Sequence, residues 1–381
     1  MNFPSKPCGK PVCRPAILMM AASLVAGVHA RTLHVAGDGN DANSGTPELP
    51  LRTLQRAAEV ARAGDTVLVR GGVYRGHVFL RFSGEPNKPV VFKNAPGEKP
   101  VVDGEGRGRI ELQSEHGWRK PIGWIVVEGF EVRNGWDGIK FYNAHHIVLK
   151  NNFVHDNANQ GILGNGHHVR IEGNIIAHNG FKPDNEKSNL EHGIYATGTD
   201  FEIVNNIIHS NRAYGIQVAG YPFEPDRHAG PEFADARRWL IRHNTIAFQQ
   251  NRAAIVVWQP DATDCVIENN ILYRNAATLG RGDCQGIDFV SAGGGHVIRS
   301  NLFFGPGRSS IGGKAGNYTA SDNLEDKDPL FADTERFDFH LRKGSPAVNS
   351  AGVQSAVATD FEGTPRPQGT AYDIGAFEYI E

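Results

Sequence analysis

A short pattern of apolar and polar positions recurs through the middle of the chain. In each copy an Asn precedes a run of two or three apolar residues, and a Gly-Ile pair follows downstream. The clearest copies begin at Asn152, Asn174, Asn206 and Asn270, with their glycines at Gly161, Gly193, Gly215 and Gly286. The interval from Asn157 to Asn179 is 22 residues, and longer intervals contain insertions. A unit this short cannot bury its own apolar side, so the copies are expected to stack into a solenoid.

The composition of the repeat predicts an all-β parallel β-helix. Short β-branched runs separated by Asn and Gly are typical of strands and tight turns, and each rung would pair with the rungs above and below it. A leucine-rich repeat would need regularly spaced leucines, and a propeller would need about twice this period. The first Asn of each copy is expected to form a hydrogen-bonded ladder at one turn: Asn152, Asn174, Asn206, Asn244, Asn270 and Asn301.

Strand alternation predicts which side chains face outward. If the Ile of each Gly-Ile pair points into the solenoid, the next residue points out. This outward ladder contains Lys140, Leu163, Tyr195, Gln217, Val256 and Asp288. The residue before each Gly can be exposed only if the chain bends there. These positions are Asp137, Gln160, His192, Tyr214, Ala253 and Gln285, with Ala253 preceding Ala254 in a weaker copy.

Both ends of the repeat carry different patterns. Apolar residues at helical spacing from Leu51 to Ala61 predict an amphipathic helix that closes the N-terminal end. From Asp328 the repeat fades into an irregular closing segment. We therefore expect one β-helix domain over residues 31–381, with a cap at 31–75, coils at about 76–325 and a C-terminal cap at 326–381.

The first thirty residues predict export. Lys6, Lys10 and Arg14 precede an apolar run from Ala16 to Val28, and Ala30 ends a small-residue cleavage site. A signal peptide over 1–30 places the mature chain in the periplasm or outside the cell. Of the four cysteines, Cys265 and Cys284 would remain, either as one disulfide or as two buried thiols. The net charge of −3 gives no basic footprint for nucleic acid.

Several motifs resemble the secreted right-handed parallel β-helix proteins of the pectate-lyase-like superfamily. These are the runs at 34–41 and 50–54, Gly64-Asp65-Thr66-Val67, Arg70-Gly71-Gly72-Val73-Tyr74, Gly344-Ser345-Pro346-Ala347 and the run at 373–378. The resemblance implies a right-handed solenoid. It also implies a polysaccharide lyase, a glycoside hydrolase, a uronan epimerase or a protein without catalysis, because fold alone does not determine activity.

The chain departs from this family at the calcium corner. Calcium-dependent lyases of the fold carry paired Asp residues just before the Gly-Ile position. Here Asn159-Gln160, Ala213-Tyr214 and Cys284-Gln285 stand there, and Asp137 is alone in its rung. The sequence therefore requires no metal or cofactor at this corner, and Ca²⁺ is left open as an additional ligand.

The candidate active site is a patch that combines Tyr195 of the outward ladder with His192, which precedes its Gly, and Arg212 at the corner, between two long insertions at about 181–190 and 221–238. Eliminative cleavage of an acidic glycan needs a base, a cation that stabilises the anion, and an acid. We assign these roles to His192, Arg212 and Tyr195. The expected substrate-binding residues are Lys140, His155, His209, Tyr214, Gln217 and Trp258. The partner is a polysaccharide bound by a monomer that does not span a membrane.

Three alternatives stay open. A glycoside hydrolase needs two carboxyl groups, for which Asp137, Glu191, Asp261 and Asp288 are available, although no two lie in adjacent rungs of one ladder. An epimerase would use similar chemistry and return the proton. A non-catalytic glycan-binding protein would need stacking aromatics alone.

Overall fold

The computed structural model describes residues 30–181, 190–220, 224, 230–259, 262–275, 284–290, 293–305, 309–313, 317–352 and 357–381. Residues 1–29 of the expected signal peptide and parts of both long insertions fall outside these residues. Over the described part of the chain, no helix is long and apolar enough to cross a membrane.

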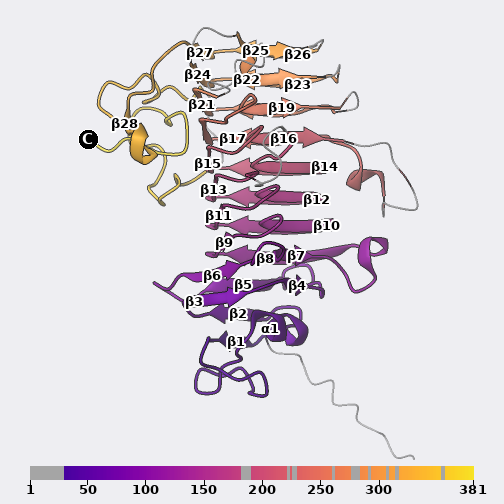
Figure 1. Cartoon of the computed structure of the whole chain (residues 1–381). Helices are drawn as coiled ribbons and strands as arrows, with labels where there is room; N and C mark the ends of the chain where they lie inside the picture. The colour runs from indigo at the N-terminus through magenta and orange to yellow at the C-terminus, as the bar shows by residue number, and fades with distance from the viewer. Residues whose placement is uncertain are drawn as a thin grey trace, which may run out of the picture.

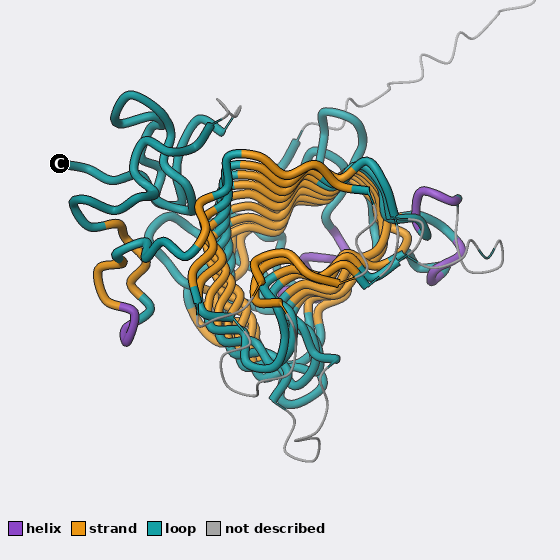
Figure 2. Tube along the Cα trace, turned by 90° about the horizontal axis from the view of Figure 1, so that it is seen from above, coloured by secondary structure: helices purple, strands orange, loops and turns teal. Residues whose placement is uncertain are grey.

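The chain winds into a stack of parallel rungs with three faces, as the repeat predicts (Figure 1). Face 1 begins at each Gly-Ile pair, face 2 follows after a bend, and face 3 follows an Asn turn. Seen along the axis, the strands of successive rungs superimpose around one interior (Figure 2). A continuous apolar core fills this interior from Leu33 to Phe303.

The strands of each face pair in register with the next rung. Face 1 contains β4 (Val78–Leu80), β7 (Ile110–Leu112), the first parts of β10 (Ile139–Lys150), β12 (Ile162–Glu172) and β14 (Ile194–Val204), then β16 (Ile216–Ala219), β19 (Ile255–Val257), β22 (Cys284–Phe289) and β25 (Ser309–Gly313). Face 2 contains β1 (Thr32–Val35), β2 (Thr66–Val69), β5 (Val90–Asn94), β8 (Ile122–Glu128), the last parts of β10, β12 and β14, then β17 (Leu240–Arg242), β20 (Val266–Glu268), β23 (His296–Arg299) and β26 (Tyr318–Ser321).

Face 3 is a separate sheet of ten strands. It contains β3 (Gly72–Arg75), β6 (Pro100–Asp103), β9 (Glu131–Arg133), β11 (Phe153–His155), β13 (Ile175–Ala177), β15 (Ile207–His209), β18 (Thr245–Ala247), β21 (Ile271–Tyr273), β24 (Leu302–Phe304) and β27 (Leu324–Glu325). Outside the three faces lie the 3-10 turns η1 (Gly117–Arg119), η2 (Pro231–Phe233) and η3 (Thr334–Arg336), and the hairpin β28 (Phe331–Asp333) and β29 (Asp338–Leu341).

The predicted asparagine ladder is confirmed at the turn between faces 2 and 3. Each side chain donates to the next one, as from Asn174 Nδ2 to Asn206 Oδ1 at 3.0 Å, and Asn323 extends the row beyond Asn301. A second ladder of Asn157, Asn179, Asn211, Gln249 and Asn275 runs between faces 3 and 1. The two rows satisfy buried backbone groups at both turns.

The second ladder explains the Gly of the Gly-Ile pairs. A Cβ on Gly161 would lie 2.7 Å from the Gly193 oxygen and 2.8 Å from Nδ2 of Asn179. Backbone and ladder therefore approach this position so closely that no side chain fits. In the rungs that carry a Gly-Ile pair, this contact excludes a side chain at the Gly, and the following Ile points inward.

The N-terminal helix is confirmed, with bounds shorter than the apolar pattern. Helix α1 (Leu54–Val60) begins after Thr53, whose side chain accepts from the backbone N–H of Arg56. Leu54, Ala57 and Ala58 are buried against the first rungs. The helix thus covers apolar surface at the start of the stack.

The closing segment does not cover the C-terminal end of the stack. It packs on the side of the solenoid, against face 3 (Figures 1 and 2). Its Phe331, Phe339 and Ile374 form a second apolar core with outward residues of face 3, such as Ile271 and Leu302. The irregular closing segment that the sequence predicts from Asp328 is present, and it packs on the side of the stack because the outward side of these rungs is itself apolar.

The Cys265 thiol is free and buried, and burial raises its pKa to about 12. It donates to the Thr263 carbonyl oxygen at 3.7 Å. This arrangement favours separate thiols over a disulfide. The Cys284 side chain lies outside the described part of the structure.

Candidate functional site

A pocket of about 200 Å³ opens on face 1 at strands β14, β16 and β19. It is lined by Leu190, His192, Tyr195, Tyr214, Gln217, Arg252 and Trp258. The predicted outward ladder places Tyr195 and Gln217 in it, because Lys140, Leu163, Tyr195, Gln217, Val256 and Asp288 are paired strand by strand. The pocket thus brings together five residues that the sequence singled out, and adds two that it did not.

His192 lines this pocket from a nearly buried position. Only 2% of the residue is exposed, whereas the sequence predicted an open surface patch. Burial and the nearby Arg252 charge lower its pKa to about 3, so the ring is neutral. Its Nδ1 accepts the backbone N–H of Tyr214 at 3.2 Å, which leaves the proton on Nε2. In this state His192 is a hydrogen-bond donor rather than a base.

Two tyrosines flank His192 and differ in how far their side chains are buried. The Tyr195 ring meets His192 edge to face, with centroids 5.7 Å apart, on the outward ladder. Tyr214 is only 3% exposed, and its hydroxyl donates to Oδ2 of Asp288 at 3.2 Å. Tyr214 therefore supports the pocket wall, and Tyr195 carries the phenol that faces outward.

Arg252 is the cation of the pocket, and the sequence did not predict it. Its guanidinium lies 5.7 Å from the centre of the Tyr214 ring. Its buried Nε has no hydrogen-bond partner, and no carboxylate among the described residues forms an ion pair with it. A cation without an anionic partner in a pocket is suited to an anionic ligand.

The expected cation, Arg212, lies elsewhere. Its guanidinium is 5.6 Å from the centre of the Phe181 ring, at the turn before face 1. Both arginines stand in the same tripeptide, Asn-Arg-Ala, in consecutive rungs. In the second rung, however, Gln249 takes the ladder position that Asn211 holds in the first, so Arg252 stands one residue closer to its Ile. In the sequence, this one-residue difference in spacing is the feature that distinguishes Arg252 from Arg212.

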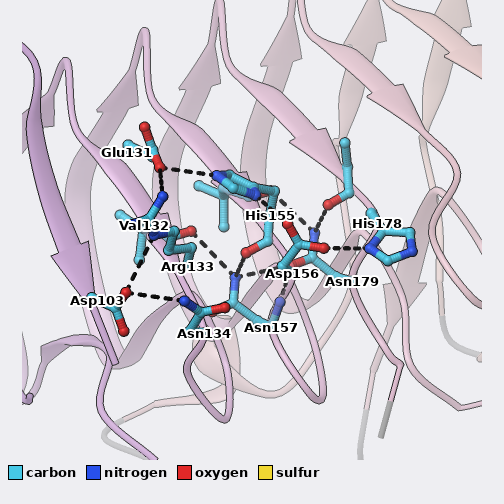
Figure 3. Close-up of polar contacts among 12 residues, drawn as sticks. Asp103, Glu131, Val132, Arg133, Asn134, His155, Asp156, Asn157, His178 and Asn179 are labelled. Carbon is cyan, nitrogen blue, oxygen red and sulfur yellow. Dashed lines mark hydrogen bonds and ion pairs between the residues drawn. The ribbon is translucent and has the colours of Figure 1, made fainter. Parts of the chain in front are cut away.

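His155 and His209 are not brought to the pocket, because both belong to face 3. His155 bonds Asp156 at 2.6 Å and contacts Glu131 at 3.4 Å; Asp156 also pairs with His178 (Figure 3). His209 is stacked against Phe337 of the closing segment, with centroids 4.2 Å apart. Neither ring flanks the patch that the sequence predicted.

Lys140 lies on face 1, two rungs from Tyr195, in a separate charged cluster. It lies opposite Glu111 in the register of β10 and β7, and Glu111 contacts His77 and Arg109. Although burial opposes ionisation, the hydrogen bond from His77 and the charges of Lys140 and Arg109 lower the pKa of Glu111. Lys140 thus extends the polar side of face 1 beyond the pocket.

The corner at Asp137 does not fit a calcium ion. One carboxylate oxygen of Asp137 pairs with Arg109, and the other accepts from Nδ2 of Asn159 at 2.7 Å. Calcium takes six to eight oxygen ligands, chiefly from several carboxylates and carbonyls. Here one carboxylate is already neutralised by a guanidinium and an amide N–H points at it.

A family model described as "Pel9A-like, right handed beta helix region" matches residues 33–189. Over 93% of this chain and 98% of the other, the structure is similar to that of pectate lyase Pel9A, with a TM-score of 0.61 and 15% identity. The chain has the right-handed parallel β-helix fold of that structure. This establishes the fold, and the matched family region ends before His192 and therefore before the pocket.

Two curated proteins are similar over parts of this β-helix chain. An uncharacterized protein, YwoF of Bacillus subtilis, is 27% identical over 51% of this chain and 45% of its own length. Pectate lyase PEL9 of Emericella nidulans is 36% identical over 22% of this chain and 21% of its own length. The matches span less than half of either relative.

Proposed function

We propose that this protein is a polysaccharide lyase that cleaves an acidic glycan by β-elimination in the face 1 pocket. The observation that carries the proposal is Arg252, a guanidinium without a carboxylate partner among the described residues, in a pocket of otherwise uncharged side chains. A uronate carboxylate would supply the missing anion. Similarity to two proteins named pectate lyases supports an acidic substrate.

In the proposed reaction, Arg252 binds the carboxylate of the sugar. Tyr195 first releases its phenolic proton to solvent. The resulting phenolate takes the proton from the carbon next to that carboxylate, and the electron pair forms a double bond as the glycosidic oxygen leaves. The Tyr195 phenol then returns the proton to that oxygen, so the phenolate is regenerated for the next cycle. Arg252 stabilises the negative charge that grows on the carboxylate during proton removal.

His192 has a supporting part in this mechanism. The sequence assigned it as the base, but its Nε2 carries the proton when Nδ1 accepts from Tyr214. We therefore assign it as an N–H donor to the substrate or to the Tyr195 oxygen. Burial keeps the ring neutral, so this donor does not add a second positive charge.

The rim of the pocket offers apolar surface for sugar rings. Trp258 is 43% exposed and Leu190 is 67% exposed, both beside the buried His192. Aromatic faces bind the apolar side of a pyranose ring, and Gln217 adds an amide. Lys140, two rungs away on the same outward ladder, is placed to contact a further acidic unit, because rungs are about 4.8 Å apart.

A hydrolase is less well supported by the same geometry. It needs two available carboxyl groups near the scissile bond. Asp137 is paired with Arg109, and Asp288 accepts from the Tyr214 hydroxyl. Asp261 lies outside the described residues. Among the described residues that line the pocket, none carries a carboxylate. We also propose that the chain acts outside the cytoplasm, because residues 1–30 are expected to be an export signal.

The test uses the purified full chain on polygalacturonate, alginate and neutral glycans. A lyase gives products with the absorbance of an unsaturated uronate. Arg252→Ala should lower kcat/KM by at least about 100-fold, and Tyr195→Phe should lower kcat by a similar factor. The matched control is Arg212→Ala, which changes the same tripeptide one rung away and should keep activity.

Other products would overturn the proposal. New reducing ends without the absorbance would identify a hydrolase, and altered uronate stereochemistry without cleavage an epimerase. Binding without any product would identify a glycan-binding protein. Equal losses in Arg252→Ala and Arg212→Ala would move the site away from the pocket.

A further inference from the structure

Four histidines meet where β10 and β12 bend from face 1 to face 2. His145 and His146 lie on one rung, and His167 and His168 lie on the next. His146 and His168 have left-handed backbone conformations, with φ of 50° and 53°. The equivalent bend repeats from rung to rung, so side chains at one position stack. We call these four residues the histidine corner.

The rings of the histidine corner are held close together. His146 and His168 are stacked with centroids 4.8 Å apart, and His145 and His167 with centroids 5.5 Å apart. Across each rung, Nδ1 atoms face one another, at 3.1 Å in the His145–His146 pair and 2.8 Å in the His167–His168 pair. One ring nitrogen from each of His146, His167 and His168 lies within 4.8 Å of the other two.

We propose that His146, His167 and His168 bind one divalent transition-metal ion of the kind that prefers imidazole, such as Zn²⁺ or Ni²⁺. Imidazole nitrogens bind these ions at about 2.0–2.1 Å, so two ligands of one ion stand roughly 3 Å apart. The 2.8 Å separation in the His167–His168 pair already matches that spacing. His146 needs only a small ring movement to complete three ligands.

The charge state of the corner suits a metal. Burial and the neighbouring imidazoles lower the pKa of His145 to about 4, and the pKa values of His146 and His167 are also lowered, chiefly by burial. These rings are therefore neutral near pH 7, the form that binds a metal. Glu232 and Asp200 act in the opposite direction on His167, and their negative charge would favour a bound cation.

Aromatic side chains hold the ligands in place. The Trp124 ring is stacked on His146 with centroids 3.9 Å apart. Phe233 of η2 meets His167 edge to face at 5.0 Å and is itself 2% exposed. Such packing limits the rotation of the imidazoles before an ion arrives, which lowers the entropy cost of binding.

The left-handed backbone alone does not explain this cluster. Asn, Asp and His all tolerate that conformation, so the backbone conformation alone would account for a His at 146 or 168. Other rungs place Trp124, Asp200, Arg238 or Asp264 in left-handed positions at this bend. His145 and His167 have no such backbone requirement, yet both are His and both point into the same cluster.

The first experiment titrates Zn²⁺ into the full chain, freed of metal and of any histidine tag, in competition with a chromophoric chelator. We expect one zinc per chain and a rise in Tm of a few degrees at saturation. The double variant His146→Asn with His168→Asn keeps residues that tolerate the left-handed backbone. It should weaken zinc binding by at least about 100-fold, and the single variant His168→Asn should weaken it at least tenfold.

The matched control is His178→Asn. His178 also has a left-handed backbone, with φ of 53°, but lies outside the histidine corner. It should bind zinc as the parent does. A second readout is Trp124, whose emission should be quenched by Ni²⁺ because its ring is stacked on a ligand; Trp124→Phe should remove that quenching.

Two results would overturn the proposal. One is the absence of saturable binding up to millimolar zinc in the parent. The other is equal binding by the parent and by His168→Asn, which is a change at an exposed side chain that leaves the fold in place. The inference does not depend on the lyase proposal, because no residue of the corner lines the face 1 pocket.

Discussion

Faces 1 and 3 are made of the same rungs, yet one is open and the other is partly covered. Both bury apolar side chains inside the solenoid, as with Ile216 on face 1 and Ile208 on face 3. They differ on the outward side. Face 1 presents Tyr195 and Gln217 around a pocket, whereas face 3 presents apolar residues such as Ile271, against which the closing segment packs. The inward pattern therefore sets the fold, and the outward pattern sets what each face contacts.

Two buried histidines, one from each face, show the same difference between an open and a covered face. His192 and His209 are 2% and 9% exposed, and burial lowers their pKa values to about 3 and about 4. His192 lines a pocket, and His209 is covered by Phe337. A lowered pKa by itself therefore does not mark an active site. The open volume beside the ring makes the difference.

The largest expected effect is on the free energy of unfolding, through a buried ion pair in the closing segment that packs against face 3. Arg366 and Glu378 form an ion pair whose side chains are both fully buried. Arg366→Ala leaves the Glu378 carboxylate buried without its partner, which should cost about 3–5 kcal/mol of unfolding free energy. Urea denaturation measures it. Arg336→Ala, an exposed change in the same segment, is the control and should cost less than about 1 kcal/mol. Equal midpoints for both variants would mean that the Arg366 pair is solvated.

The next effect is on turnover, which should fall when His192 is replaced and should persist when His209 is replaced. His192→Ala should lower turnover on a cleaved glycan by at least about 100-fold, because the pocket loses an N–H donor. His209→Ala should leave turnover within about threefold once rates are normalised to folded protein. Steady-state kinetics on both variants checks this. Full activity in His192→Ala would remove this residue from the site.

Much of the fold and part of the site could be predicted from the sequence. The Gly-Ile pairs fixed the phase of face 1, because no side chain fits at the glycine, and strand pairing confirms the whole outward ladder from Lys140 to Asp288. That phase placed Tyr195 and Gln217 correctly on the outward side. Local period and turn chemistry were sufficient for these features.

The rest depended on single-residue shifts and on contacts between distant segments. The sequence singled out Arg212 and not Arg252. Arg252 stands one residue closer to its Ile because Gln249, rather than Asn251, takes the ladder position in its rung. The burial of His209 depends on Phe337, 128 residues later in the chain, which no local pattern reveals. Outward Ile207 and Ile271 were the available signal that face 3 is covered.

A smaller effect is expected at the ladder that both faces share. Asn206 is fully buried, and its amide bonds the Ile171 carbonyl and the Asn244 side chain at 2.9 Å each. Asn206→Ala should cost about 1–3 kcal/mol because these groups lose partners. Thermal unfolding of the parent and variant measures the change. An unchanged midpoint would mean that water replaces the amide.

The smallest effect concerns acid, and here the two histidines should behave alike. The folded-state pKa of His209 is lowered to about 4 from an ordinary value near 6.5. As the pH falls below about 6.5, the unfolded chain binds a proton that the folded chain does not, so stability is lost, by up to about 1.4 kcal/mol per pH unit. His209→Gln and His192→Gln should each remove one such contribution. Asp373, whose pKa burial raises to about 6, acts with the opposite sign, so the comparison must be the difference between variant and parent. Urea denaturation at pH 7 and pH 5 gives that difference. The contrary outcome is that both variants lose as much unfolding free energy between pH 7 and pH 5 as the parent does. Both rings would then reach water in the folded protein, and His209 would not be covered by the closing segment.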